Sequence, residues 1–237
     1  MGTKRAKNIS QINKAVAAKR LHKMIERKNE YLEVVDEIHV YFAKGNSKTG
    51  EGVPSVSLIP VYNCTNCEHC SGLCYDLRND CLHSGCCDRR SQNAAILEAD
   101  PERYFREINE GVKMFRFFRW HIGGDIVSEF YFEKMVWIAE ENPHCDFLAF
   151  TKSFDIVNTY LDNHQLPQNL HIIFSAWVGQ EMDNRHNLPT SNPLFFDGST
   201  TAHDGAVYCS GNCTECARAG AGCWTMKNGD EVIFPAH

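Results

Sequence analysis

The residues of this chain best suited to chemistry are its cysteines, twelve among 237 residues. Eight of them form two groups with short, regular spacing. The first cysteine group is Cys64-x2-Cys67-x2-Cys70-x3-Cys74, and the second cysteine group is Cys209-x3-Cys213-x2-Cys216-x6-Cys223. Bacterial ferredoxins use the spacing of the first group to hold iron–sulfur cubes. We therefore expect both groups to supply thiolate ligands to metal centres.

Iron and zinc are the two metals that these thiols could bind. Zinc would use paired Cys-x2-Cys turns, which Cys64/Cys67 and Cys213/Cys216 could supply. It would leave the remaining cysteines unexplained, and a chain of this length buries a core without a metal. The pattern favours two [4Fe–4S] clusters, with zinc as the alternative. Three further cysteines are candidate metal ligands, whereas Cys145 is expected to be a buried thiol. The three are Cys81, Cys86 and Cys87.

The second cysteine group also has the Cys-x3-Cys-x2-Cys spacing of radical S-adenosylmethionine enzymes, in which one iron stays open to that cofactor. In those enzymes the motif lies near the start of a β/α barrel, with an aromatic residue before the third cysteine. Here it lies near the C-terminus, and Glu215 occupies that position. Cys223 can serve as a fourth ligand, which favours a closed cluster. A radical S-adenosylmethionine-like enzyme is the alternative hypothesis.

Strands and helices alternate between the two groups. Strands are predicted at 114–121, 146–151 and 170–175, and helices at 92–98, 101–108, 128–140 and 154–163. Shorter extended segments are predicted at 38–43, 56–61 and 206–208. This alternation predicts parallel strands joined by helical crossovers. The expected fold class is α/β, as a partial or complete β/α barrel of the TIM or radical S-adenosylmethionine type.

The loops after the three main strands carry the other candidate site residues, because chemistry gathers at the carboxyl ends of parallel strands. Asp125 and Lys152 are candidate catalytic residues, and Gly123, Gly124 and Asp125 could bind a cofactor. The Gly-Gly-Asp segment is similar to the Gly-Gly-Glu that holds the amino group of S-adenosylmethionine in radical enzymes. Arg119, like Lys152, could neutralise an anionic cluster. Both cysteine groups follow extended segments, which predicts one shared rim.

The N-terminal region is basic, although the net charge of the chain is -6. Residues 1–30 carry nine Lys and Arg against two Glu, and residues 10–37 are predicted to be helical. We expect two parts, a basic helix over 1–37 and one β/α domain over 38–237. The helix could contact nucleic acid, but a solvated helix is favoured. No secretory or membrane-spanning segment is evident, so a cytoplasmic protein without a membrane partner is expected.

The motifs resemble those of the phage protein family called gene product 88 over roughly residues 45–224. The likeness consists of five features, namely Cys74-Tyr75, Asp100-Pro101, Gly124-Asp125, Phe150-Thr151-Lys152 and Cys223-Trp224. The resemblance implies a phage or prophage origin and a metal-cluster site, with Cys64, Cys70 and Cys74 as its recurring cysteines, and it transfers no activity. The expected function is electron transfer or a reductive reaction by an iron–sulfur protein, with an electron-transfer protein as partner. A zinc-stabilised module that binds nucleic acid or protein is the remaining alternative.

Overall fold

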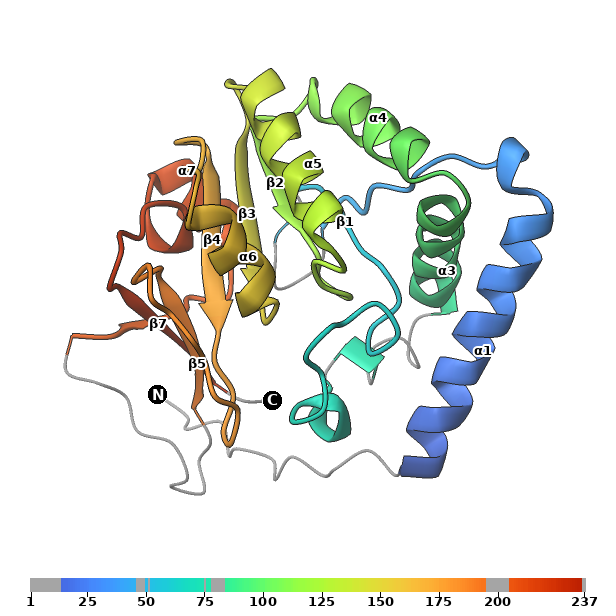
Figure 1. The fold of residues 1–237 in the computed structure, drawn as a ribbon, viewed down its shortest axis with the longest axis horizontal. Coiled ribbons are helices and arrows are strands. Elements are labelled where there is room, and N and C mark those ends of the chain that lie inside the picture. Colours follow the sequence, from blue (N-terminus) through green and yellow to red (C-terminus); the bar gives the residue numbers. More distant parts are fainter. Residues whose placement is uncertain are drawn as a thin grey trace.

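The computed structural model describes residues 14–45, 50, 52–74, 76–77, 84–194 and 205–235. Its centre is a seven-stranded sheet in which every neighbouring pair is parallel, in the order β1-β2-β3-β4-β5-β7-β6 (Figure 1). The strands are β1 Ser55–Val56, β2 Phe117–Trp120, β3 Asp146–Thr151, β4 Leu170–Ser175, β5 Thr190–Leu194, β6 Val207–Tyr208 and β7 Glu231–Pro235. The predicted α/β class and parallel strands are confirmed. Within the described residues β1 and β6 are edge strands, so the sheet is open and forms no closed barrel.

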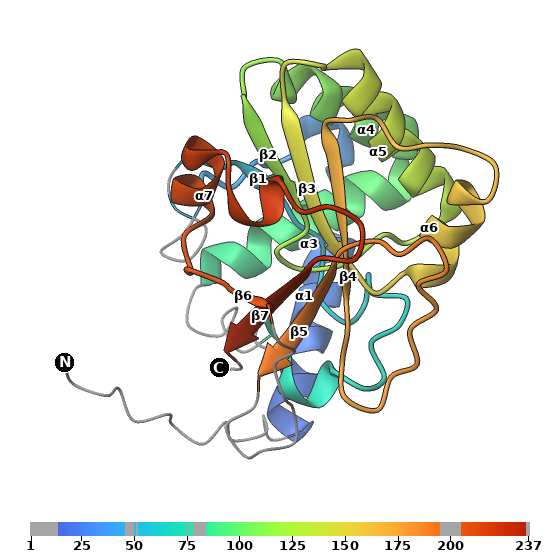
Figure 2. The ribbon, with the colours of Figure 1, turned by 90° about the vertical axis from the view of Figure 1, so that its left-hand side faces the viewer.

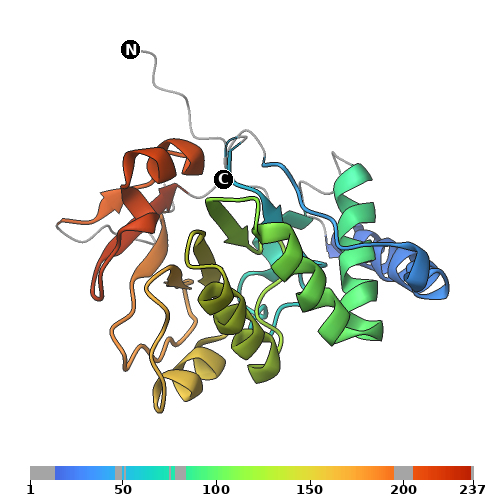
Figure 3. The same cartoon turned by 90° about the horizontal axis from the view of Figure 1, so that it is seen from above.

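The helices lie mainly on one side of this sheet. They are α1 Lys14–Glu33, α3 Ser84–Ala99, α4 Pro101–Val112, α5 Glu129–Glu141, α6 Phe154–Leu161 and α7 Cys213–Ala219. Helix α1 packs along α3 at the far side of the molecule from α7 (Figure 3). Asp100 caps α4, near the start predicted for that helix, by accepting from the Arg103 N–H, and Pro101 follows it. None of the helices described is long and apolar enough to cross a bilayer.

Alternate residues of the central strands face two separate hydrophobic clusters. Phe118, Trp120 and Phe147 point towards the larger cluster, which includes residues of α4 and α5. Leu148 and Ile173 point the opposite way and pack with Trp224 and its neighbours. This alternation follows from the two-residue period of a strand. Both faces of the sheet are therefore covered, by different parts of the chain.

Two predicted extended segments differ from the structure. Residues 38–43 are extended but make only one isolated bridge to the sheet, between Ala43 and Ser55. The reason is that side chains of α3 and α4 form hydrogen bonds with the backbone of this segment. The Asn93 amide, for example, bonds both the N–H and the C=O of Tyr41. The strand predicted at 56–61 ends at Val56. On α5, the large apolar side chains of Phe130 and Trp137 are partly exposed.

Two strands were missing from the prediction. β5 and β7 fall in a stretch that is rich in proline and glycine, where the sequence lacks the alternation of a typical strand. They pair with each other over five residues, and β5 also joins the end of β4. Tertiary pairing thus made strands from segments with weak local signals.

The close approach of α4 to residue 42 gives a test of the packing. A Cβ at Gly111 would lie 2.5 Å from the Phe42 ring, whereas a Cβ at Gly85 in α3 would meet nothing within 4 Å. We expect Gly111→Ala to lower the free energy of unfolding by about 1–3 kcal/mol because it overpacks this contact. Gly85→Ala should be neutral or raise it by up to about 1 kcal/mol. Urea denaturation measures both, and equal stabilities would contradict this packing.

Candidate functional site

The cysteine loop after β1 is fastened to the loops that follow β2 and β3. The Asp125 N–H donates to the Asn63 C=O at 2.7 Å. The Thr65 and Ser153 hydroxyls lie 2.6 Å apart, and the Asn66 amide donates to the Lys152 C=O at 2.7 Å. Three chain segments therefore meet beyond the carboxyl ends of β1, β2 and β3 (Figure 1). The predicted gathering of the first cysteine group, Asp125 and Lys152 at this edge is confirmed.

Asp125 is the buried centre of these contacts. One carboxylate oxygen accepts from the Thr151 hydroxyl at 2.6 Å and from the Ile126 N–H at 2.7 Å, and the other accepts from the Lys152 N–H at 2.8 Å. Burial raises the pKa of Asp125, while these hydrogen bonds and the Lys152 charge oppose the rise. The carboxylate thus positions the loops after β2 and β3.

Gly123 and Gly124 are required by close packing. A Cβ on Gly123 would overlap the carboxylate of Asp76, which is paired with Arg90 at 2.6 Å in a buried ion pair. Gly124 has φ +80, and its Cβ would lie 2.7 Å from that of Leu58. Their backbone geometry therefore has a structural cause that needs no bound cofactor. The Asp76–Arg90 pair carried no spacing signal in the sequence.

The first cysteine group is half-buried and receives hydrogen bonds. The Val61 N–H donates to the Cys64 sulfur at 3.3 Å, and the Leu77 N–H donates to the Cys74 sulfur at 3.4 Å. Burial raises the pKa of Cys64, and it raises that of Cys74 to about 11. A hydrogen bond from Cys67, helped by the charge of Lys152, lowers the pKa of Cys70 to about 6. N–H groups directed at sulfur are the surroundings that thiolate ligands require.

Lys152 projects from the end of β3 towards the next strand. Its ammonium donates to the Ser175 hydroxyl at 2.9 Å and lies 5.6 Å from the centre of the Trp177 ring. These partners hold a positive charge close enough to the first cysteine group to favour the thiolate of Cys70. The residue can therefore stabilise an anion at this edge.

The second cysteine group lies on a face of the sheet, and the prediction of one shared rim was wrong. Cys213 begins α7, and Cys213, Cys216 and Cys223 pack against the cluster that contains Leu148 and Ile173. Helix α7 lies on the opposite side of the strands from α4–α6 (Figure 2). The chain turns back over the sheet after β6, so a position just past a strand did not keep these cysteines at the carboxyl edge.

Arg119 brings a positive charge from the middle of β2 to the second group. Its guanidinium donates to the Cys213 sulfur at 3.4 Å and lies 4.9 Å from the Phe150 ring centre. Its Nε is buried and has no hydrogen-bond partner among the described residues. Burial raises the pKa of Cys209, and it raises that of Cys223 to about 12, while Arg119 acts against both shifts. A thiolate centre would neutralise this arginine.

The remaining cysteines are distributed elsewhere. Cys145 is fully buried, as predicted, and Cys86 and Cys87 lie in the first turn of α3. Cys81 lies outside the described residues. Within the described ranges, no three His, Cys, Asp or Glu side chains are placed as the ligands of a single metal ion. In its donor types and hydrogen bonds, each main cysteine group fits a thiolate-bound centre.

The fold and the site define an α/β protein with a cysteine-rich loop at the carboxyl edge of an open parallel sheet. This chain belongs to the family described as gene product 88, whose model matches residues 40–193. The match includes the first cysteine group and the loops of Asp125 and Lys152, and it ends before the second group. The chain matches no curated protein and no solved structure.

His121, at the end of β2, is buried and has φ +49. Its Nε2 lies 2.8 Å from the Tyr131 hydroxyl, and burial lowers the pKa of the imidazole to about 3. Because the folded pKa lies below the unfolded value of about 6.5, protons bind the unfolded state first as the pH falls. His121 therefore has a structural role at the end of β2.

Acidification should therefore weaken the fold through His121. Between pH 8 and pH 5, this residue should lower the free energy of unfolding by about 2 kcal/mol. His121→Asn tolerates the positive φ and cannot be protonated, so it should flatten that part of the profile. Denaturation at several pH values measures the slope. An unchanged slope in the variant would exclude a buried neutral His121.

Proposed function

We propose that this protein is an iron–sulfur protein that holds one [4Fe–4S] cluster on each cysteine group and serves electron transfer or a reductive reaction. The observation that carries the proposal is the half-buried first cysteine group, in which N–H groups donate to the Cys64 and Cys74 sulfurs and the Lys152 ammonium favours the Cys70 thiolate. Cys64, Cys67, Cys70 and Cys74 would be the ligands. Such a cluster would supply one electron at a time.

The surroundings of the second group support a second anionic centre. An arginine with a buried Nε is costly unless a negative charge lies near it. Arg119 has no carboxylate within ion-pair distance in the described part of the chain, and its guanidinium donates to a sulfur. Cys209, Cys213, Cys216 and Cys223 would be the ligands. The four thiolates would give Arg119 its counter-charge.

A radical S-adenosylmethionine-like reaction has less support. That hypothesis pairs an open iron on the second group with Asp125 as a cofactor ligand. The charge interactions of Asp125 instead link it to Cys64 and Cys70 of the first group, and its oxygens already accept three hydrogen bonds. A closed cluster on the second group agrees better with these contacts. A protein partner that exchanges electrons follows from the proposal.

Metal analysis tests the proposal directly. Protein purified without oxygen should contain about eight irons per chain, four in each cube, and show the broad visible absorbance of thiolate-bound iron. Cys64→Ser and Cys213→Ser should each reduce iron to about four per chain, because each removes a ligand of one cluster. Cys145→Ala, which changes a thiol outside both groups, should retain all the iron. Colourless protein loaded with zinc would contradict the proposal.

The charge of Arg119 should control the potential of the second cluster. Removing a positive charge beside a cluster disfavours the reduced form, by about 2 kcal/mol for an effective dielectric constant near 20, or on the order of 100 mV. Arg119→Met should therefore lower that potential in a redox titration followed by electron paramagnetic resonance. Arg116→Met, which removes the arginine beside Phe117, serves as control and should cause a much smaller shift. Equal shifts of the potential in the two variants would exclude a specific role of Arg119.

A further inference from the structure

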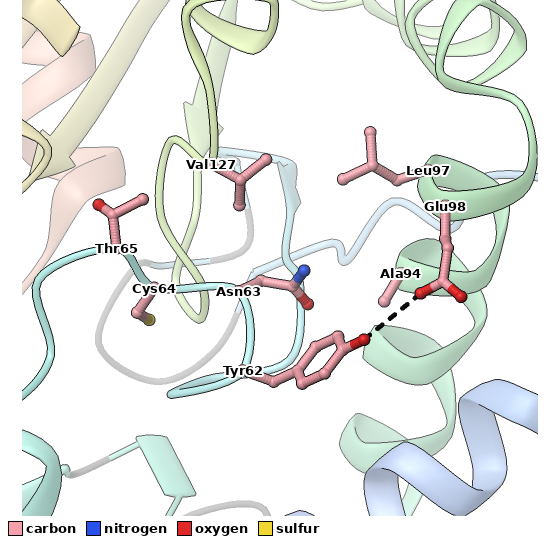
Figure 4. Close-up of a pocket in the computed structure, with 8 residues that line it drawn as sticks. All are labelled: Tyr62, Asn63, Cys64, Thr65, Ala94, Leu97, Glu98 and Val127. Atoms are coloured by element: carbon pink, nitrogen blue, oxygen red, sulfur yellow. Dashed lines mark hydrogen bonds between the residues drawn. The ribbon is translucent and has the colours of Figure 1, made fainter.

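A cavity of about 370 Å³ opens beside the first cysteine group, between the turn after β1 and helix α3 (Figure 4). Cys64 belongs both to its wall and to the first cysteine group. The remaining wall residues come from the same turn, from α3 and from the loop before α5. They are Tyr62, Asn63, Thr65, Ala94, Leu97, Glu98 and Val127. The volume is at the small end of ligand pockets.

The cavity combines apolar walls with a neutralised charge. Ala94, Leu97 and Val127 form its apolar part. At its edge the buried Lys28 ammonium donates to the Glu98 carboxylate at 2.5 Å and to the Tyr62 hydroxyl at 3.3 Å. Because this ion pair is satisfied within the protein, a ligand with a net charge would find no free counter-charge here. The walls therefore favour a neutral molecule.

One donor and one acceptor remain available in the cavity. The Asn63 carbonyl oxygen accepts from the Ile59 N–H, whereas its amide nitrogen has no hydrogen-bond partner among the described residues. One oxygen of Glu98 accepts from Lys28 and Tyr62, and the other has no partner within the described ranges. In Figure 4 the Asn63 amide points towards α3, which carries Glu98. The two groups complement a ligand that both accepts and donates.

We propose that this cavity binds a small neutral molecule that has an apolar ring and a carboxamide-like donor and acceptor, and that it holds this molecule against Cys64. The ring would lie on Ala94, Leu97 and Val127. The carbonyl of the ligand would accept from the Asn63 amide, and its N–H would donate to Glu98. If the first group holds a cluster as proposed above, the ligand lies beside a source of electrons.

Binding of 4-fluorobenzamide, followed by fluorine NMR, tests the cavity. The metal-free protein should bind this probe saturably with a millimolar dissociation constant. Ala94→Leu fills the apolar end and should weaken binding at least tenfold. Asn63→Asp keeps the acceptor for Ile59 but removes the amide donor, and it should also weaken binding at least tenfold. Circular dichroism checks that both variants fold.

Asn163→Asp makes the same chemical change on an exposed residue after α6 and should bind the probe like the original protein. Absence of saturable binding, or equal affinity in all four proteins, would overturn the proposal. The measurement uses protein without metal, so a failure to bind iron leaves it unaffected. Conversely, protein that binds iron but does not bind the probe would refute the proposal of ligand binding in the cavity, and the cluster proposal would stand.

Discussion

The buried carboxylate of Asp125 fastens together the loops on which the candidate site depends. Its hydrogen bonds from Thr151 and Lys152 join the loop after β2 to the end of β3 and the loop that follows, and its own N–H joins the cysteine loop through Asn63. A buried carboxylate is costly unless such donors satisfy it. Because the buried carboxylate needs hydrogen-bond donors, Thr151 and Lys152 lie next to Asp125. The first cysteine group, the Lys152 ammonium and the adjacent cavity all take their places from this contact.

The two cysteine groups have different electrostatic surroundings. The first lies at the carboxyl edge with both a carboxylate, Asp125, and an ammonium, Lys152, close by. The second lies under α7 against one face of the sheet, with the guanidinium of Arg119 as its neighbouring charge. A more positive environment stabilises a reduced cluster. Two clusters held in this way would be chemically unequal, which suits a protein that moves electrons in one direction.

The basic N-terminal helix has a structural part in this arrangement. Arg27 pairs with Asp88, and Lys28 pairs with Glu98 at the edge of the cavity. Both acidic partners lie on α3, so these charges fix α1 along α3. Arg27 and Lys28 therefore stabilise the packing of α1 on α3. A contact with nucleic acid, which the sequence left possible but did not favour, would depend on the other cations of the helix.

The sequence by itself determined the α/β class, three central strands, the helix that Asp100 caps and the composition of both cysteine groups. These features depend on local periodicity, capping and spacing, which are readable along the chain. Tertiary structure decided that residues 38–43 bond to side chains of α3, that β5 and β7 pair, and that Gly123 packs on Asp76. It also placed the second cysteine group on a face instead of the rim, next to Arg119. The physical reason is that these contacts join residues far apart in sequence. Buried backbone groups and buried charges are costly without partners, and no local sequence pattern identifies partners that come from distant parts of the chain.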